Sequence, residues 1–389
     1  MSSVNSSLAD LTEQVENSGP DRSIEDFTYI DLGSVDARSK EITATKRLLL
    51  ADAPGRARQR VRSGDVLVST VRPNLNGVAA VTPALDGAIA STGFCVLRPK
   101  PGVLDERYLL NWVRSPPFVA EMTRLATGAS LPAVSDAIVK SSEIPLPHLP
   151  EQRRIAGILD EADELRAKRR RALALLEELA DSIFIHVLGD PGTSAGRWPK
   201  LRVDEIAATR LGKMPDSGRV AGENRKPYLR NANVHWMRCE LQSLAEMDFT
   251  EAEQSEFAVQ PGDVMVCEGG QPGRCAIWQG QIEEVYFHKG LHRVTLDPSV
   301  MVPEVFVHTM KFLVEGGHLA DSFSSASVAH LTSEKLRAIE LAVPPIHLQA
   351  EYVASSRAVE ALTGQNAAHL DRLDELFASL QHRAFRGEL

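Results

Sequence analysis

Two long stretches of the chain show the apolar spacing of amphipathic helices. Residues 151 to about 188 contain no proline and one glycine, and apolar side chains recur mostly three or four positions apart. A similar stretch runs from residue 349 to about residue 385. A helix of about 38 residues is roughly 57 Å long, which exceeds what one domain can cover. We therefore predict that the two helices pair with each other as an antiparallel coiled coil.

The segments in front of the two helices have the pattern of short strands and turns. Turn-rich loops at residues 72–77 and 268–273 occupy corresponding places between two strands, and such loops often carry functional side chains. The expected strands are residues 27–32, 65–71, 78–81, 94–97, 264–267, 274–278 and 292–296, and the expected helices are residues 106–113 and 304–313.

Sequence landmarks recur at an offset of about half the chain. Gly-Asp-Val at residues 64–66 has its counterpart at residues 262–264, and Gln152, which follows a proline-rich segment, has its counterpart in Gln349. A repeat this long indicates two similar domains rather than a solenoid of short units. The predicted fold class is therefore α+β, with two similar mixed α/β domains in tandem and a long helix after each.

These patterns also give the expected domain boundaries. Residues 1–20 are polar, but Leu8, Leu11 and Val15 have helical spacing, so we expect this segment to be flexible or to join the helical bundle. The expected parts are a first domain at 1–150, a first long helix at 151–188, a linker at 189–198, a second domain at 199–347 and a second long helix at 348–389.

Composition narrows the class of protein. No apolar run reaches the roughly 18 residues of a membrane span, and the N-terminus lacks the apolar region of a signal peptide, so we expect a cytoplasmic location. The four cysteines lack regular spacing and are expected to be reduced. Cys267, Cys275, His288 and His292 could be drawn as a zinc set. Strand alternation explains them more simply, and no metal site is predicted.

The charge pattern gives two conflicting indications. A formal net charge of −9 disfavours nucleic acid, which needs clustered Lys and Arg. Positive charge is nevertheless concentrated locally, in Arg56, Arg58, Arg60 and Arg62 of the first half and in residues 200–240 of the second. A solvated loop explains either run alone. Their similar repeat positions favour a surface that binds a polyanion.

Common catalytic and cofactor-binding motifs are missing from the sequence. We find no phosphate-binding loop, dinucleotide fingerprint, zinc-protease helix or nucleophile turn. Asp65 and Asp263 each precede a strand and are interpreted as turn formers. The chain therefore looks like a binding protein that is not an enzyme and holds no cofactor.

Several of these segments resemble the specificity subunit of type I restriction-modification systems. The resemblance rests on residues 29–36, the two Gly-Asp-Val strands, residues 127–130 and, most specifically, residues 144–159, and it spans nearly the whole chain. The second copy departs from the pattern at one place, because Ala350 and Glu351 stand where the first copy has Arg153 and Arg154.

The resemblance implies a non-catalytic DNA-recognition subunit. Each domain would be a target recognition domain that reads one half of a bipartite sequence in double-stranded DNA. The paired helices would set the gap and dock two copies of a methyltransferase (modification) subunit, which would hold S-adenosylmethionine. A motor and endonuclease (restriction) subunit would join for cleavage.

Candidate DNA-binding residues follow from the chemistry of base edges. Arg pairs well with guanine, and Asn or Gln with adenine. Small hydroxyl residues in the segments near 130 and 327 could cap a helix or bind a phosphate, and capping is the favoured interpretation. The candidates are Arg72, Asn74, Asn76 and Ser130 in the first domain and Arg230, Asn231, Asn233, Gln271, Arg274 and Ser327 in the second.

Two other functions fit the sequence. One is a coiled-coil scaffold whose two domains bind proteins and no nucleic acid. The other is a nuclease that would use Asp65, Glu268 and nearby carboxylates with magnesium.

Overall fold

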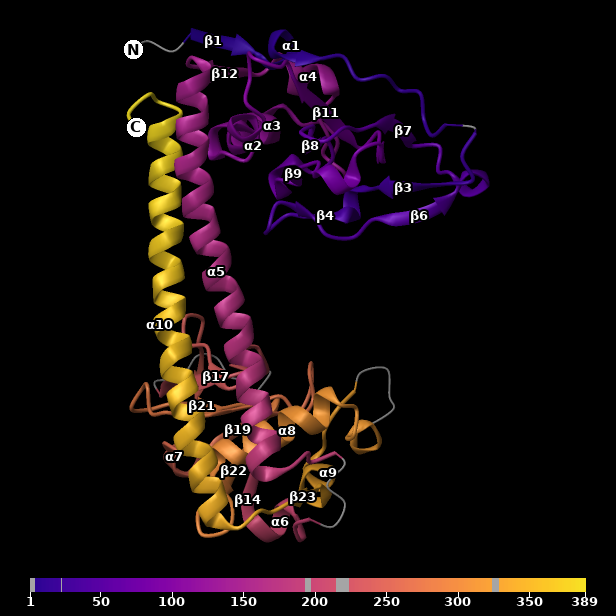
Figure 1. Cartoon of the computed structure of the whole chain (residues 1–389). Helices are drawn as coiled ribbons and strands as arrows, with labels where there is room; N and C mark the ends of the chain where they lie inside the picture. Colours follow the sequence, from indigo (N-terminus) through magenta and orange to yellow (C-terminus); the bar gives the residue numbers. More distant parts are fainter. Residues whose placement is uncertain (1–3, 22, 193–196, 215–223, 324–328) are drawn as a thin grey trace. The chain divides into compact units, whose positions relative to one another are not determined.

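The computed structural model describes residues 4–21, 23–192, 197–214, 224–323 and 329–389 (Figure 1). The chain divides into two compact units. Unit 1 contains residues 1–173 and 365–389, and unit 2 contains residues 174–364. The long helices α5 (Leu149–Leu188) and α10 (Ile346–Ala384) each contribute residues to both units. Their bounds lie within three residues of those expected from the apolar spacing.

Unit 1 is built on two four-stranded sheets. In one sheet β3 and β10 run parallel, and in the other β8 pairs antiparallel with both β9 and β11. The first sheet has the order β6 (Lys46–Leu49), β3 (Asp26–Ile30), β10 (Ile89–Ser91), β7 (Ala57–Arg60), and the second has the order β2 (Thr12–Glu13), β11 (Phe94–Pro99), β8 (Val66–Ser69), β9 (Val78–Ala80). Two-stranded pairs join β1 (Val4–Ser7) to β12 (Glu143–Leu146) and β4 (Val35–Asp36) to β5 (Glu41–Ile42).

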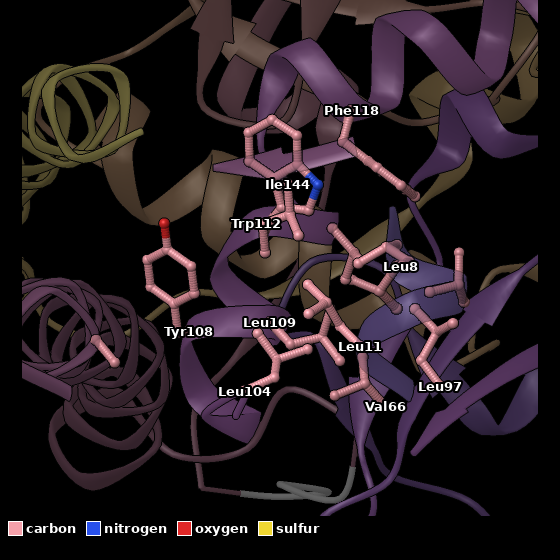
Figure 2. Close-up of a cluster of buried hydrophobic side chains, with 14 of the residues drawn as sticks. Leu8, Leu11, Val66, Leu97, Leu104, Tyr108, Leu109, Trp112, Phe118 and Ile144 are labelled. Atoms are coloured by element: carbon pink, nitrogen blue, oxygen red, sulfur yellow. The ribbon is translucent and has the colours of Figure 1, made fainter. Parts of the chain in front are cut away.

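The main core of unit 1 lies between its second sheet and four short helices. These helices are α1 (Leu8–Leu11), α2 (Glu106–Val113), α3 (Pro116–Leu125) and α4 (Asp136–Ser141). Val66 and Leu97 from the sheet meet Leu109 and Trp112 of α2 (Figure 2). Burial of such side chains stabilises the unit by roughly 1.5–3 kcal/mol each.

The N-terminal segment differs from the expectation. The prediction that residues 1–20 are flexible or join the helical bundle is wrong for Val4–Glu13, because β1 pairs with β12 and β2 with β11. Leu8 and Leu11, which suggested a helix, form one turn of helix and are buried in the core of the first domain (Figure 2). Backbone pairing with strands far along the chain is not visible in local sequence.

Unit 2 repeats this plan. β19 again pairs antiparallel with two neighbours, and β15 pairs parallel with β21. The four-stranded sheet has the order β14 (Ala207–Leu211), β22 (Leu291–Leu296), β19 (Val264–Cys267), β20 (Cys275–Ile277). The three-stranded sheet has the order β18 (Ala245–Asp248), β15 (Arg225–Leu229), β21 (Tyr286–Phe287). Two-stranded pairs join β13 (Lys200–Arg202) to β23 (Glu340–Ala342) and β16 (Val234–His235) to β17 (Arg238–Cys239). Its short helices are α6 (Val203–Ile206), α7 (Glu251–Phe257), α8 (Pro303–Glu315) and α9 (Ser333–Ala338).

Individual hydrogen bonds show how closely the second domain follows the first. The buried Gln152 side chain accepts a bond from the Asp105 N–H at 2.8 Å and donates to the carbonyls of Val103 and Pro147 at 3.0 and 2.9 Å. Gln349 makes the same three bonds, accepting from Val302 N–H at 3.0 Å and donating to the carbonyls of Val300 and Pro344 at 2.9 and 2.7 Å. The predicted fold of two similar α/β domains, each followed by a long helix, is confirmed.

The Gly-Asp-Val turns are also equivalent. The carboxylate of Asp65 accepts the backbone N–H of Arg62 at 2.8 Å, and that of Asp263 accepts the backbone N–H of Gln260 at 2.7 Å. The Asp65 carboxylate is further held by two hydrogen bonds from the Arg98 guanidinium. Both aspartates therefore stabilise turns, as the sequence predicts.

The two long helices run antiparallel where they meet inside each unit (Figure 1). In unit 1, Arg166 of α5 forms an ion pair with Asp374 of α10, and Arg169 donates to the Asn366 side chain at 2.6 Å. Polar side chains of the two helices therefore bind each other in the part of the pair that belongs to unit 1. In unit 2, the Phe184 ring of α5 packs edge-on against Tyr352 of α10 with ring centroids 5.2 Å apart.

The C-terminal end of the chain completes the core of unit 1. Phe377 and Ala384 of α10 are buried there, and the Phe385 ring packs against Tyr108 and Trp112 of α2 with centroid distances of 5.4 and 4.9 Å. Among the described residues, no helix is sufficiently long and apolar to cross a membrane.

Candidate nucleic-acid interface

A strained turn between β8 and β9 displays three candidate residues of the first domain. Arg72 and Asn76 both adopt left-handed backbone conformations, with φ of 50° and 51°, on either side of the one-turn 3-10 helix Pro73–Leu75. A left-handed residue directly before proline is sterically unfavourable and persists only where the surroundings impose it. Here the Arg72 N–H donates to the Pro132 carbonyl at 2.7 Å. The turn is therefore held rigidly, with the side chains of Arg72 and Asn74 exposed.

Asn76 stabilises this turn through hydrogen bonds of its side chain and its backbone carbonyl. Its side-chain amide donates to the Arg114 carbonyl at 3.1 Å, and its own carbonyl accepts the Lys40 ammonium at 2.6 Å. Desolvation, and secondarily the Arg114 charge, lower the pKa of Lys40 to about 8. Of the three candidates on the turn, Arg72 and Asn74 thus remain available for a ligand.

Ser130 lies on a neighbouring loop. Residues Thr127 and Ala133 close this loop through two backbone hydrogen bonds of 2.9 Å, and Ala133 also forms a β-bridge with Val71. The predicted capping role of the 127–130 segment is wrong, because Ser135 caps α4 by accepting the Ile138 N–H. Ser130 is exposed beside the turn of Arg72, so the structure brings these two segments together.

In the second domain, Asn233 is structural. It is fully buried in the 3-10 turn after β15, where its side chain accepts the Arg230 N–H at 3.0 Å and donates to the Glu240 carbonyl at 3.2 Å. Ser34 occupies the equivalent place in the first domain and accepts the Asp31 N–H at 3.0 Å. Arg230 is half-buried, and its guanidinium donates to the Ser243 carbonyl at 2.7 Å.

Arg274 joins two loops of the second domain. Its guanidinium donates to the Asn231 carbonyl at 2.9 Å and to the Gln271 side chain at 2.6 Å. Arg274 and Asn231 are half-buried, and Gln271 is exposed. The structure therefore gathers the three residues into one surface, with Gln271 outermost. Ser327 lies outside the described residues.

Two residues that the DNA-binding prediction omitted complete this surface. His330 Nδ1 lies 3.2 Å from the Glu268 carboxylate, and the backbone of Glu268 accepts the Leu331 N–H at 2.7 Å. His330 is remote in sequence, so local patterns could not have placed it here. The nearby His292 ring is buried, and burial lowers its pKa, so it stays neutral at pH 7.

The two cysteines of the possible zinc set lie in strands of the second domain. Cys267 and Cys275 are free and buried in β19 and β20, and burial raises the pKa of both thiols. No group of three or more His, Cys, Asp or Glu side chains suited to a metal ion occurs in the described part of the chain.

Comparison with known proteins shows what this architecture is similar to. A family model described as the type I restriction modification DNA specificity domain matches residues 59–177, a segment that includes Arg72 and Ser130. The chain is 22% identical over 339 residues to the StySPI specificity subunit of Salmonella potsdam, covering 76% of this chain and 68% of that subunit. The chain is therefore similar to type I restriction-modification specificity subunits over most of its length. It is also 22% identical over 180 residues to the HindI specificity subunit of Haemophilus influenzae, covering 46% of this chain and 39% of that subunit's length.

Solved structures of type I restriction-modification proteins have a fold similar to that of this chain. A chain from work on complex assembly and conformational transition of the type I R-M system is 25% identical, with a TM-score of 0.62 over 99% of this chain and 98% of that one. The S subunit from M. genitalium is 15% identical, with a TM-score of 0.57 over 98% of this chain and 96% of that one, and therefore shares the fold.

Proposed function

We propose that this chain recognises a bipartite sequence in double-stranded DNA for a type I restriction-modification complex. The observation that carries the proposal is a duplicated domain whose equivalent loops present different side chains. The loop after β8 offers Arg72 and Asn74, whereas the loop after β19 offers Gln271. Because base edges are read by such side chains in a groove, the two domains would read different half-sites.

The long helices would set the gap between the half-sites and dock two copies of a methyltransferase subunit. Their apolar stripes are not fully used in pairing, since several leucines remain 44–57% exposed. An apolar surface of this kind on paired helices suits a protein partner. The leucines are Leu165 and Leu376 in unit 1 and Leu175, Leu179 and Leu362 in unit 2.

Catalysis would belong to the partners. The methyltransferase subunits would bind S-adenosylmethionine and transfer its methyl group to adenine, and a motor and endonuclease subunit would join for cleavage. Consistent with this division, the buried cysteines and paired aspartates of this chain have structural roles. The specificity subunit would act by placing DNA against enzymes that it does not contain.

The proposal is tested by mapping methylated adenines in the source genome with and without this gene. We expect one split motif to lose its methylation when the gene is deleted. Unchanged methylation would instead favour a protein-binding scaffold, and metal-dependent DNA cutting by the isolated chain would favour a nuclease.

Asn74 and Asn233 offer a matched pair for testing the interface. Asn233→Ala removes two buried hydrogen bonds and should lower the free energy of unfolding by about 2 kcal/mol. Asn74→Ala changes an exposed side chain and should alter it by less than about 0.5 kcal/mol, while weakening discrimination within one half-site by about 1–3 kcal/mol. Urea unfolding and competition binding by the complex measure the two effects. Equal discrimination by wild type and Asn74→Ala would remove Asn74 from the interface.

A further inference from the structure

An outward row of arginines lies on β7 and the residue before it, on a different strand from the loops described above. Residues 56–60 alternate between exposed and buried, so Arg56, Arg58 and Arg60 face solvent, whereas Ala57 and Gln59 are buried. Alternate residues in a strand are about 6.6 Å apart. The three guanidinium groups, named here the arginine row, therefore extend over roughly 13 Å of an edge strand.

Gln59 fixes which side of the strand faces outward. Its buried side chain donates to the carbonyls of Ser91 at 2.9 Å and Phe94 at 2.7 Å. The pairing register of β7 with β10 shifts next to Arg58, whose carbonyl instead accepts the Gly19 N–H at 2.7 Å. A one-residue slip would bury arginine and expose Gln59, so these bonds keep the arginines on the surface.

The arginine row forms no ion pair within the described part of the chain. Arg58 donates only to the Gly55 carbonyl, and neither Arg56 nor Arg60 forms an ion pair there. Arg60 contributes to the lowered pKa of exposed Asp21, after larger effects from hydrogen bonds of Ser23. Arg62 is left out of the row because it borders a groove that Glu13 and Glu106 also line.

The equivalent positions of the second domain do not repeat this row. Val61 and Val259 are equivalent, since their N–H groups donate to the carbonyls of Ala88 and Val285. Equivalent positions in this region of the two domains are 198 residues apart, so Arg58 and Arg60 correspond to Glu256 and Ala258. Glu256 lies in α7 and forms an ion pair with Arg210. An acidic and an apolar residue thus replace the two arginines at these positions.

We propose that the arginine row binds the phosphate backbone of DNA next to the half-site read by the first domain, without reading its sequence. This inference rests on the proposed function and adds a second, non-specific contact to it. A line of unpaired cations suits a line of phosphates. A stable protein interface would need an apolar centre, and the buried Ala57 and Gln59 leave none between the arginines.

The test uses the complex of this chain with its co-expressed methyltransferase subunits and a duplex carrying the methylated motif. Binding is measured between about 50 and 200 mM NaCl, because each phosphate contact contributes about 0.9 to the slope of log affinity against log salt. Arg58→Gln/Arg60→Gln should reduce that slope by about 1.8. Affinity for the motif and for a scrambled duplex should fall by the same factor, with the motif itself unchanged.

A matched control is Lys46→Gln/Arg47→Gln. It removes the same charge from the same sheet, but at β6, where the two cations form ion pairs with Asp31 and Asp26. The control should leave the slope unchanged, and Arg58→Lys/Arg60→Lys should largely restore it. A thermal melt of each variant verifies folding.

Three results would overturn the inference. An unchanged slope in Arg58→Gln/Arg60→Gln, with wild type still selecting its motif, refutes the arginine row alone. Loss of co-purifying methyltransferase from this variant would identify the row as a protein contact. A wild-type complex that selects no motif would refute the proposed function itself.

Discussion

Gln152→Met is expected to lower the free energy of unfolding by about 3 kcal/mol or more, the largest stability effect among the substitutions considered. The buried Gln152 amide makes three hydrogen bonds that join the start of α5 to the loop before α2 and to the end of β12. Methionine has a similar shape but leaves one N–H and two carbonyls without partners. Each buried group left unpaired costs about 1–3 kcal/mol. Chemical denaturation followed by circular dichroism measures the change.

The adjacent residue provides the control for this substitution. The Arg153 side chain is 61% exposed and forms one ion pair of 3.6 Å with Asp105. Arg153→Met should therefore change stability by less than about 1 kcal/mol. Gln349→Met should act on unit 2 as Gln152→Met acts on unit 1. Equal stability of Gln152→Met and Arg153→Met would show that the repeated hydrogen bonds do not anchor the helix.

Shortening both long helices by seven residues is expected to abolish methylation of the original motif. Deleting residues 167–173 from α5 and 363–369 from α10 removes two turns from each, keeps the apolar stripe in phase, spares the exposed leucines and preserves the contact of Phe184 with Tyr352. Each helix becomes roughly 10 Å shorter. If the helices set the gap, the DNA site should now need a gap about three base pairs shorter, given a phosphate every 3.4 Å of each strand.

Methylation sequencing of cells that express the deletion variant gives the result. A same-length control, Lys168→Ala/Arg171→Ala, changes exposed side chains in the deleted segment and should keep the original motif. Persistence of the original gap in the deletion variant would mean that the helices do not set the spacing.

The elements that sequence predicted well are those with continuous apolar signals. Residues 106–113 and 264–267 match α2 and β19, and the apolar spacing of the two long helices locates both within three residues at each end, although the boundary of 348–389 placed the end of α10 five residues too late. Strand β7 was missed because its buried positions are Ala57 and Gln59, which do not make an apolar alternation. Its place depends on bonds to Ser91 and Phe94, more than thirty residues away.

The sequence predicted the residue types of the candidate interface, but not which of their side chains are exposed and which are bonded inside the domain. Asn74 and Asn76 look equivalent in the sequence, yet only Asn74 is exposed, because the Asn76 amide is bonded to the Arg114 carbonyl. Asn233 is likewise occupied by the Arg230 and Glu240 backbones. Backbone groups that come near a side chain only in the folded protein can occupy its hydrogen-bonding atoms. Residue type alone therefore overestimates how many side chains can contact DNA.

The position of Phe385 has a consequence for biosynthesis. Its ring packs on Tyr108 and Trp112, and Phe377 and Ala384 are buried in the same core. A ribosome delivers the first domain before unit 2, yet these side chains emerge only after residues 174–364 of unit 2. The first domain is thus completed only after unit 2 has been made, and a stop codon between residues 365 and 376 would remove part of its core while leaving residues 174–364 of unit 2 in place.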